Sequence, residues 1–362
     1  MLVRRLLYCC LFFVVAAYFT GVANACTSAI VSGKCTPDGR PLLWKNRDTG
    51  TLQNFVDRVS PSDSLSMAYV ALFNAGDTLR EQAWIGVNEA SFAIMNTASY
   101  NLAPDTARVR DREGYVMARA LGRCLTLADF EQLLDTLQRP LGVQANFGVV
   151  DASGQGAFYE TCDTGYVRFL LSDSPTGVLI RTNFSVSGEP DGGYGYIRYN
   201  NAEHLTAPEA AAGMLTPQFF TDTVSCSFYH SLYGYDVLEN KACPEWIVDQ
   251  DFIPRHSTSA SVVVVCRKDI SDTREPVMWC ALGYPPCAIA QACTVYNVAP
   301  GLQPCRRTGL AEACVESMKL KDKIFPVVRG SGQHYIDVAA LKKINALCRK
   351  ESYKNYVNFK LQ

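Results

Sequence analysis

Two β-rich runs lie near the start of the sequence, and a turn signal separates them. The run CTSAIVSG begins at Cys26, the run PLLWKNRD ends at Asp48, and Thr-Pro-Asp-Gly lies between them at residues 36–39. Proline presets φ for the turn, aspartate bonds to nearby backbone, and glycine accepts a positive φ. The pattern therefore predicts an antiparallel hairpin that holds the segment after Cys26 in a sheet.

The remaining elements follow in groups. Apolar residues recur at three- and four-residue spacing over residues 114–137, which indicates helix, and Thr126 is the expected N-cap of a second helix inside that range. The other predicted strands span residues 66–75, 83–98, 146–170, 177–184, 259–266 and 276–283, and the other predicted helices span residues 196–214 and 337–351. Strands cluster instead of alternating singly with helices, which indicates an α+β fold and not a doubly wound sheet.

Residues 1–25 read as a secretory signal peptide. Two arginines precede an almost unbroken apolar run over residues 6–19, and Ala23-Asn24-Ala25 matches the small-x-small pattern that signal peptidase cuts. The apolar run is shorter than the roughly 20 residues that a membrane-spanning helix needs. We therefore expect an exported protein, periplasmic or secreted, without stable membrane insertion after cleavage. Its mature chain would begin at Cys26 and form one domain over residues 26–362, with a helical C-terminal extension from about residue 311.

Charge and histidine content exclude several classes of function. Lys and Arg number 34 against 35 Asp and Glu, so the net charge of −1 gives no indication of nucleic acid as a partner. The sequence contains only 4 histidines, and the cysteine spacings are not those of a zinc site. We therefore expect neither a metal nor a cofactor.

The cysteines admit disulfides in an exported protein. Of the 15 cysteines, Cys9 and Cys10 lie in the predicted signal peptide, so an odd number remains and at least one stays unpaired. Five lie close enough in sequence for local bridges, although spacing does not define their connectivity: Cys280, Cys287, Cys293, Cys305 and Cys314.

Cleavage before Cys26 would give one residue both a thiol and a free α-amino group. An α-amine has a reference pKa of about 7.7–8.0, so it can act as a base near neutral pH without a separate histidine. The next strand carries Lys45, Asn46, Arg47 and Asp48, and alternation places Asn46 and Asp48 on one face. A carboxylate facing the amine would orient it. The alternative is that these four residues form a solvated strand end.

The ordered motifs resemble those of the N-terminal-cysteine nucleophile hydrolases. CTSAIVSG, TPDGRPLLWKNRDT, GVNE followed by FAIMN, NFGVVDASGQGAFYE, RTNF, and Met-Trp to Gly-Tyr-Pro follow one another over roughly residues 26–300. The family includes penicillin V acylases, bile salt hydrolases, acid ceramidase-like amidases, acyltransferase-type C45 peptidases and C69 dipeptidases. The resemblance implies a four-layer αββα sandwich of antiparallel sheets.

The resemblance also implies roles for individual residues. Cys26 matches the nucleophile and, through its amine, the base. Asp48 matches the carboxylate that orients the amine. Asn183 matches the oxyanion-hole side chain, and its alternative explanation is a turn asparagine after a strand. Asn96 is a candidate second polar contact, and otherwise an asparagine at a strand end. Arg198 lies where the family has a late arginine that supports the nucleophile, and otherwise is a surface arginine at a helix start.

One position departs from the family pattern. Lys45 stands where the family has arginine, three residues before the aspartate. Lysine cannot reproduce the bidentate fork of a guanidinium. Either Lys45 supplies only the charge, or Arg47 takes over the role from a different position. This departure argues against a close relationship to bile salt hydrolases.

The sequence thus predicts an exported enzyme that cleaves linear amide C–N bonds, in N-acyl amides or amino-acid conjugates, through a thioester. A small acyl amide is the expected partner, and the oligomeric state stays open. An acyltransferase or dipeptidase of the same superfamily is an alternative. Other classes are a binding protein with an inert Cys26, a lipoprotein anchored through Cys26, and a Cys–His protease using His230 or His256. The lipoprotein alternative is disfavoured because alanine, and not leucine, stands three residues before Cys26.

Overall fold

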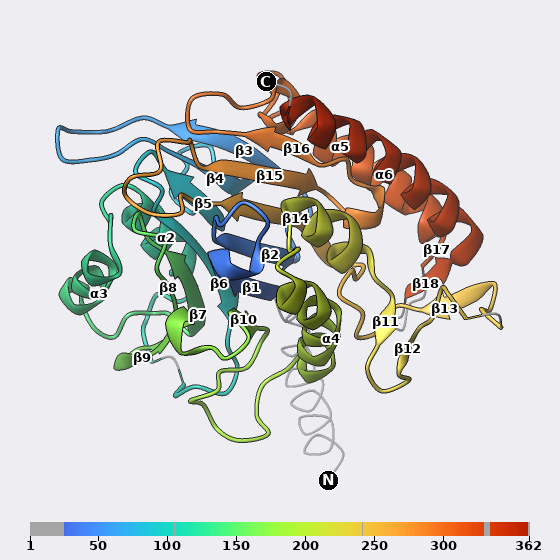
Figure 1. Ribbon diagram of the computed structural model, residues 1–362, viewed down its shortest axis with the longest axis horizontal. Coiled ribbons are helices and arrows are strands. Elements are labelled where there is room, and N and C mark those ends of the chain that lie inside the picture. The colour runs from blue at the N-terminus through green and yellow to red at the C-terminus, as the bar shows by residue number, and fades with distance from the viewer. Residues whose placement is uncertain (1–24, 105, 241, 329–333, 361–362) are drawn as a thin grey trace, which may run out of the picture.

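Two antiparallel sheets lie at the centre of the computed structural model, which describes residues 25–104, 106–240, 242–328 and 334–360 (Figure 1). The predicted signal peptide, Ala25 excepted, lies outside the described residues. The first sheet has the order β10 (Val178–Arg181), β1 (Thr27–Val31), β2 (Leu42–Asp48), β14 (Thr258–Val265), β15 (Val277–Leu282) and β16 (Gln291–Cys293). The second runs in chain order: β3 (Asn54–Val59), β4 (Tyr69–Asn74), β5 (Ile85–Asn88), β6 (Ala93–Ala98), β7 (Ala145–Val150), β8 (Gly156–Cys162) and β9 (Gly165–Leu170).

Helices cover the outer faces of both sheets. The helices α2 (Glu113–Leu121) and α3 (Leu127–Thr136) pack on the second sheet, and α4 (Tyr196–Ala212), α5 (Glu312–Ile324) and α6 (Val338–Lys360) lie on the other side of the molecule (Figure 1). This is the predicted αββα sandwich. A bend separates α2 from α3, and the side chain of Thr126 accepts from the backbone of Asp129 in a capping box, as predicted.

Alternation along β1 and β2 explains why the first sheet is buried on both faces. Ile30 and Leu43 point into the core between the sheets, whereas Ala29, Val31 and Trp44 point into a second core beneath the helices. Every residue of β1 and β2 is buried. A central strand covered on both faces gains apolar burial from every side chain, so the segment after Cys26 is held firmly in the sheet.

The predicted hairpin of β1 and β2 is confirmed. Thr27 pairs with Asn46, and the register continues to Val31 and Leu42. The turn contains Gly39 at a φ of 76°, a conformation that glycine adopts without steric cost.

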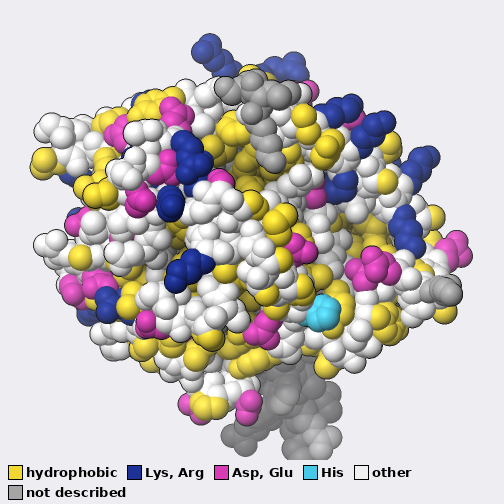
Figure 2. All heavy atoms as spheres, in the orientation of Figure 1, with side chains coloured by type: hydrophobic (Ala, Val, Ile, Leu, Met, Phe, Trp, Pro, Cys, Tyr) yellow, Lys and Arg dark blue, Asp and Glu magenta, His cyan; other side chains and the backbone are white. Residues whose placement is uncertain are grey.

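Smaller elements complete the C-terminal part of the described chain. Two short strands, β11 (Tyr229–His230) and β12 (Tyr235–Asp236), form a hairpin, and β13 (Trp246–Val248), β18 (His334–Asp337) and β17 (Val327–Val328) form a three-stranded sheet. Figure 2 shows Lys and Arg side chains along the C-terminal helices, where Lys342, Lys343 and Lys350 are exposed. No helix among the described residues has the length and apolarity required to cross a bilayer.

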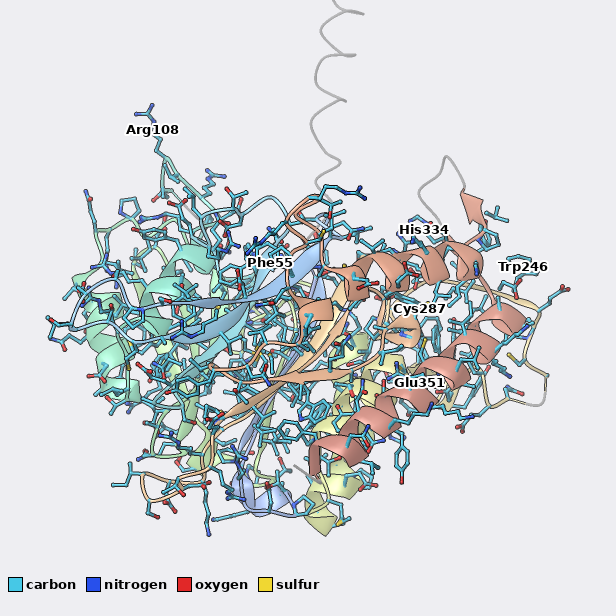
Figure 3. The ribbon with its side chains drawn as sticks, turned by 90° about the horizontal axis from the view of Figure 1, so that it is seen from above. Phe55, Arg108, Trp246, Cys287, His334 and Glu351 are labelled. Atoms are coloured by element: carbon cyan, nitrogen blue, oxygen red, sulfur yellow. The ribbon has the colours of Figure 1, made fainter. Side chains whose placement is uncertain are left out.

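The local disulfides that the sequence allowed from Cys280 onward are absent from the described chain. All thirteen cysteines from Cys26 to Cys348 are free thiols. Cys287 lies under the C-terminal helices in a core cluster separate from that of Phe55 (Figure 3). Cys305 is exposed, and Cys314 packs against the backbone of β3. Cys280, Cys293 and Cys314 share the core cluster between the sheets, where Cys280 and Cys293 lie within hydrogen-bond reach of each other as free thiols.

Candidate active site

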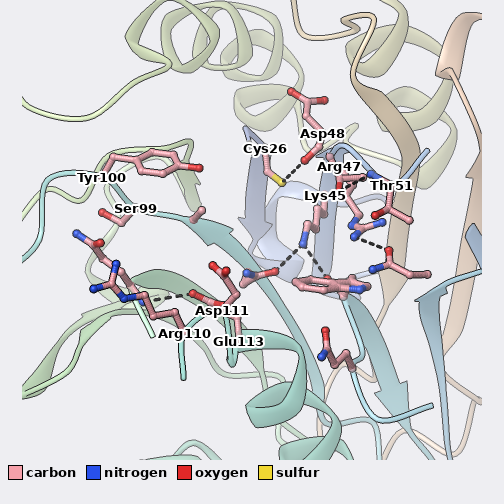
Figure 4. A pocket seen from close by; sticks show the side chains of 17 residues that line it. Cys26, Lys45, Arg47, Asp48, Thr51, Ser99, Tyr100, Arg110, Asp111 and Glu113 are labelled. Carbon is pink, nitrogen blue, oxygen red and sulfur yellow. Dashed lines mark hydrogen bonds between the residues drawn. The ribbon is translucent and has the colours of Figure 1, made fainter. Parts of the chain in front are cut away.

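Cys26 stands at the start of β1 and lines a cavity of about 490 Å³ (Figure 4). The residue is 6% exposed, and its Sγ lies 3.8 Å from the carbonyl oxygen of Asp48. The nitrogen of Cys26 is a peptide nitrogen here because Ala25 is still attached. It stands in for the α-amine that cleavage would produce.

Asn183 and Arg198 hold Cys26 by its main chain. The nitrogen of Cys26 donates to Asn183 Oδ1 at 2.9 Å, and Arg198 Nη1 donates to the carbonyl oxygen of Cys26 at 2.7 Å. Arg198 also donates to Asn183 Oδ1 at 2.8 Å and to Thr27 Oγ1 at 3.0 Å. Neither Asn183 nor Arg198 is a surface residue, since they are 0% and 1% exposed. Burial, with nearby Arg255, lowers the pKa of Arg198 to about 10, so the side chain is charged at neutral pH.

Asn183 uses its amide differently from an oxyanion donor. Its Oδ1 accepts from Cys26 and Arg198, and its Nδ2 donates to the carbonyl oxygen of Ala98 at 2.9 Å. These contacts fix the position of the Cys26 nitrogen and tie β6 to the segment after β10.

Asp48 has partners other than the nitrogen of Cys26. Arg255 donates to Asp48 Oδ2 from Nε at 3.0 Å and from Nη2 at 2.7 Å. Thr258 donates to Asp48 Oδ1 at 2.6 Å. Asp48 is 2% exposed, and each of its carboxylate oxygens already has a hydrogen-bond partner. Asn46 Nδ2 lies 3.4 Å from Asp48 Oδ1, so the predicted common face of these two side chains is confirmed.

The alternative of a solvated strand end is wrong. Lys45, Asn46, Arg47 and Asp48 are 1%, 0%, 3% and 2% exposed. Lysine and arginine are almost never fully buried without a specific partner. The four residues therefore form part of a built site and not a charged surface.

Lys45 and Arg47 face the cavity with neutral hydrogen-bond partners. Lys45 Nζ donates to Asn96 Oδ1 at 2.7 Å and to the carbonyl oxygen of Trp84 at 2.9 Å. Burial lowers the pKa of Lys45 to about 8 and that of Arg47 to about 10, so both remain largely charged at neutral pH.

Arg47 is held from two neighbouring strands. It donates to Asn54 and, at 2.8 Å, to Asn74 Oδ1, and its guanidinium lies 4.7 Å from the centroid of the Trp84 ring. Lys45 and Arg47 both line the cavity that Cys26 lines.

The amide nitrogen of Asn96 is a candidate hydrogen-bond donor to a molecule in the cavity. Because its Oδ1 accepts from Lys45, the Nδ2 group occupies the other side of the amide. Asn96 lines the cavity together with Cys26. It can donate a hydrogen bond to a group bound there.

The opposite wall of the cavity comes from the residues that follow β6 and from those that lead into α2. Figure 4 shows Tyr100, Ser99, Arg110, Asp111 and Glu113 across the cavity from Cys26. Glu113 is buried, and its Oε1 accepts from the backbone nitrogen of Gln144 at 3.3 Å, whereas Arg110 and Asp111 are exposed.

Two hydrogen-bond partners of Asp48 were not predicted from the sequence. Arg255 and Thr258 reach Asp48 from 207 and 210 residues away, and no local motif marks either residue. A strand pairing between β2 and β14 would have pointed to Thr258, which lies opposite Asp48 in the register.

The histidines named for a Cys–His protease lie elsewhere. His256 stacks on His334 with ring centroids 3.6 Å apart, and His230 stacks on Tyr233 at 4.3 Å. Among the residues that the structure describes, neither His230 nor His256 lines the cavity of Cys26. The chain thus offers Cys26 no imidazole base within that cavity.

Comparisons with known proteins find similarity in structure alone. No family model matches the chain, and no curated protein matches it. The N-acylethanolamine-hydrolyzing acid amidase ortholog of Caenorhabditis elegans is 12% identical over 66% of this chain and 92% of its own, with a TM-score of 0.40. A variant of the conjugated bile acid hydrolase of Clostridium perfringens is 9% identical over 75% and 93%, with a TM-score of 0.44. The penicillin V acylase of Agrobacterium tumefaciens is 12% identical over 75% and 87%, with a TM-score of 0.41.

These are the classes that the sequence motifs resemble. At such low identities and TM-scores, the functional argument rests on the contacts around Cys26.

Proposed function

We propose that the chain, once residues 1–25 are removed and it is exported, is a cysteine amidohydrolase that cleaves the linear C–N bond of a small acyl amide. The observation that carries the proposal is a thiol beside two buried cations, on a residue whose nitrogen is fixed by Asn183. Cleavage would turn that nitrogen into an amine on the same residue as the nucleophile. A nucleophile and its base would then share one fixed position.

The first half-reaction follows from these groups. The α-amine of Cys26 takes the thiol proton, and Sγ attacks the amide carbonyl carbon. The carbonyl oxygen becomes an oxyanion, for which Asn96 Nδ2 is the proposed donor, and the charge of Lys45 stabilises it. The α-ammonium then gives its proton to the leaving nitrogen, the C–N bond breaks, and a thioester remains.

Water completes the cycle. It attacks the thioester carbonyl while the α-amine accepts one of its protons, and the C–S bond breaks. The acid product leaves, and the thiolate recovers its proton from the α-ammonium. In this scheme Asn183 and Arg198 are positioning residues, because their hydrogen bonds go to Cys26 and not to the reacting carbonyl. Asp48 would act through Arg255 and Thr258 to fix the end of β2.

The proposal is tested with the mature chain. Intact mass and N-terminal sequencing establish whether it begins at an unmodified Cys26. N-acyl amino acids, conjugated bile acids, penicillins and short peptides are then screened for release of acid and amine. Cys26→Ala should abolish turnover, whereas Cys35→Ala should retain it. Cys35 is a suitable control because it is also a buried free thiol of the same hairpin, and it bonds the carbonyl oxygen of Thr176 at 3.3 Å.

Two outcomes would overturn the proposal. A diacylglycerol mass on Cys26 would indicate a lipoprotein, because the thiol would be blocked. Turnover that survives Cys26→Ala would show that another group is the nucleophile. A correctly cleaved chain without turnover of any compound in the screen would favour the binding-protein alternative.

A further inference from the structure

Two buried cations of the cavity, Lys45 and Arg47, carry more positive charge than the side chains bonded to them balance. Lys45 and Arg47 are 1% and 3% exposed, and within the described residues neither forms an ion pair with a carboxylate. Their hydrogen bonds all go to amide or carbonyl oxygens. Buried charges are ordinarily paired, so this arrangement indicates a missing anion.

Of the two cations, Arg47 is the one with less negative charge near it. Asp48, on the same strand, is already bound by Arg255, which donates twice to its Oδ2. Lys45 and Arg47 both lie within the electrostatic reach of Asp48 and of the Cys26 thiol, but only Lys45 also lies within that of Glu113. Cys26 as a thiolate would supply one negative charge against two cations. Arg47 also has donors to spare, since a guanidinium has five N–H groups and two of them are used by Asn54 and Asn74.

The position of Arg47 assigns the anion to one half of the substrate. The leaving amine must reach solvent after the C–N bond breaks, whereas the acyl group stays in the cavity as a thioester. Arg47 is buried, while Arg110 and Asp111 on the other wall are exposed. A group held by Arg47 therefore belongs to the acyl half.

The other lining residues limit the size and character of that acyl group. The carbon-rich side chains of the cavity are those of Trp84, Ala98 and Tyr100, and most of the rest are polar or charged. A long alkyl chain would gain little by leaving water for such walls. Glu113 and Asp111 on the far wall would repel a second carboxylate placed there.

Resting on the amidase function proposed above, we propose that the substrate is the monoamide of a short dicarboxylic acid, whose free carboxylate is bound by Arg47. The guanidinium would donate to the carboxylate while the amide carbonyl lies against Cys26 and Asn96. The reaction would release an amine and the dicarboxylic acid.

The test compares three p-nitroanilides of equal chain length with the mature chain: succinyl (anionic), butyryl (neutral) and β-alanyl (cationic). We expect kcat/KM for the succinyl compound to exceed that for butyryl about tenfold or more, the range of one charge-assisted hydrogen bond. The preference should be lost in Arg47→Gln and partly kept in Arg47→Lys. Arg80→Gln is the matched control, because Arg80 pairs with Asp57 at 2.8 Å outside the cavity. The readout is the ratio between substrates, so a general loss of activity does not imitate the effect.

Binding to the inactive Cys26→Ala variant separates this proposal from the amidase function. Calorimetry should show tighter binding of the succinyl than of the butyryl compound, and Cys26→Ala with Arg47→Gln should remove the difference. Preferred binding without hydrolysis by the wild-type chain would overturn the amidase function and support the anion site. Cys26-dependent hydrolysis that favours the butyryl or β-alanyl compound would overturn the anion site alone. Loss of the preference in Arg110→Gln and not in Arg47→Gln would also overturn the assignment.

Discussion

Arg198→Lys tests whether the hydrogen bonds to Cys26 matter for catalysis and not only for folding. The guanidinium spans three acceptors: the carbonyl oxygen of Cys26 at 2.7 Å, Asn183 Oδ1 at 2.8 Å and Thr27 Oγ1 at 3.0 Å. Lysine keeps the charge, but its single ammonium cannot reproduce the planar fork. Asn183 Oδ1 would retain the bond from the nitrogen of Cys26, whereas one or two buried acceptors would lose their donor. Each such loss costs about 1–3 kcal/mol, so we expect the free energy of unfolding to fall by about 2–4 kcal/mol.

Arg40→Lys provides the matched control for this stability loss. Arg40 is 6% exposed and donates to the carbonyl oxygens of Cys266, Val265 and Glu275 at 2.7, 3.1 and 2.7 Å. Its partners lie at the turn end of β2, away from Cys26. Both variants should therefore lose similar stability in urea unfolding, while only Arg198→Lys should misplace the nucleophile.

Two assays, run at urea concentrations below the unfolding midpoint, separate a loss of stability from a misplaced Cys26. The first is kcat/KM on the best substrate of the screen, where Arg198→Lys should lose about 10–100-fold, or about 1.4–2.7 kcal/mol of transition-state stabilisation. The second is the alkylation rate of Cys26, followed on its own peptide by mass spectrometry. Wild-type kcat/KM in folded Arg198→Lys, or an equal loss in Arg40→Lys, would refute the reasoning.

Three further results are expected. Because burial lowers the pKa of Lys45 to about 8, kcat/KM should fall as the pH rises through about 8. Lys45→Arg should move this fall in kcat/KM to higher pH. If the fall stays at the same pH in the variant, Lys45 is not its source. Glu160→Gln should lower the free energy of unfolding by about 3–5 kcal/mol, because the buried guanidinium of Arg181, 2.7 Å away, would lose its counter-charge. A loss below about 1 kcal/mol would mean that the ion pair contributes little to stability. Denatured, unreduced mature chain should react with thirteen equivalents of a thiol reagent, and fewer would reveal disulfides.

Local patterns accounted for the elements that the sequence predicted well. The hairpin after Cys26 depends on two apolar runs and a four-residue turn, and the start of α3 depends on Thr126 and the residue three positions later. Such signals involve residues within one turn or one strand pair. The prediction that Asn46 and Asp48 share a face succeeded for the same reason, because alternation is a local property of a strand.

The partners of Asp48 could not be predicted in this way. Arg255 lies in the loop before β14 and meets Asp48 only because β14 pairs with β2. Nothing in the residues around either position encodes that pairing. The state of the cysteines could not be predicted either, since sequence spacing does not show that Cys287 and Cys314 enter different core clusters.

The charges around the nitrogen of Cys26 also bear on its proposed role as a base. In the uncleaved chain this nitrogen donates its one hydrogen to Asn183 Oδ1, an oxygen that Arg198 also contacts. Cleavage would leave the nitrogen in place and add hydrogens to it. A protonated amine would then share its acceptor with a guanidinium, and like charges so close disfavour the protonated form. The carboxylate of Asp48 offers limited relief, because Arg255 already binds its Oδ2 and Thr258 its Oδ1. The arrangement therefore favours the neutral amine, which is the form that can take the thiol proton.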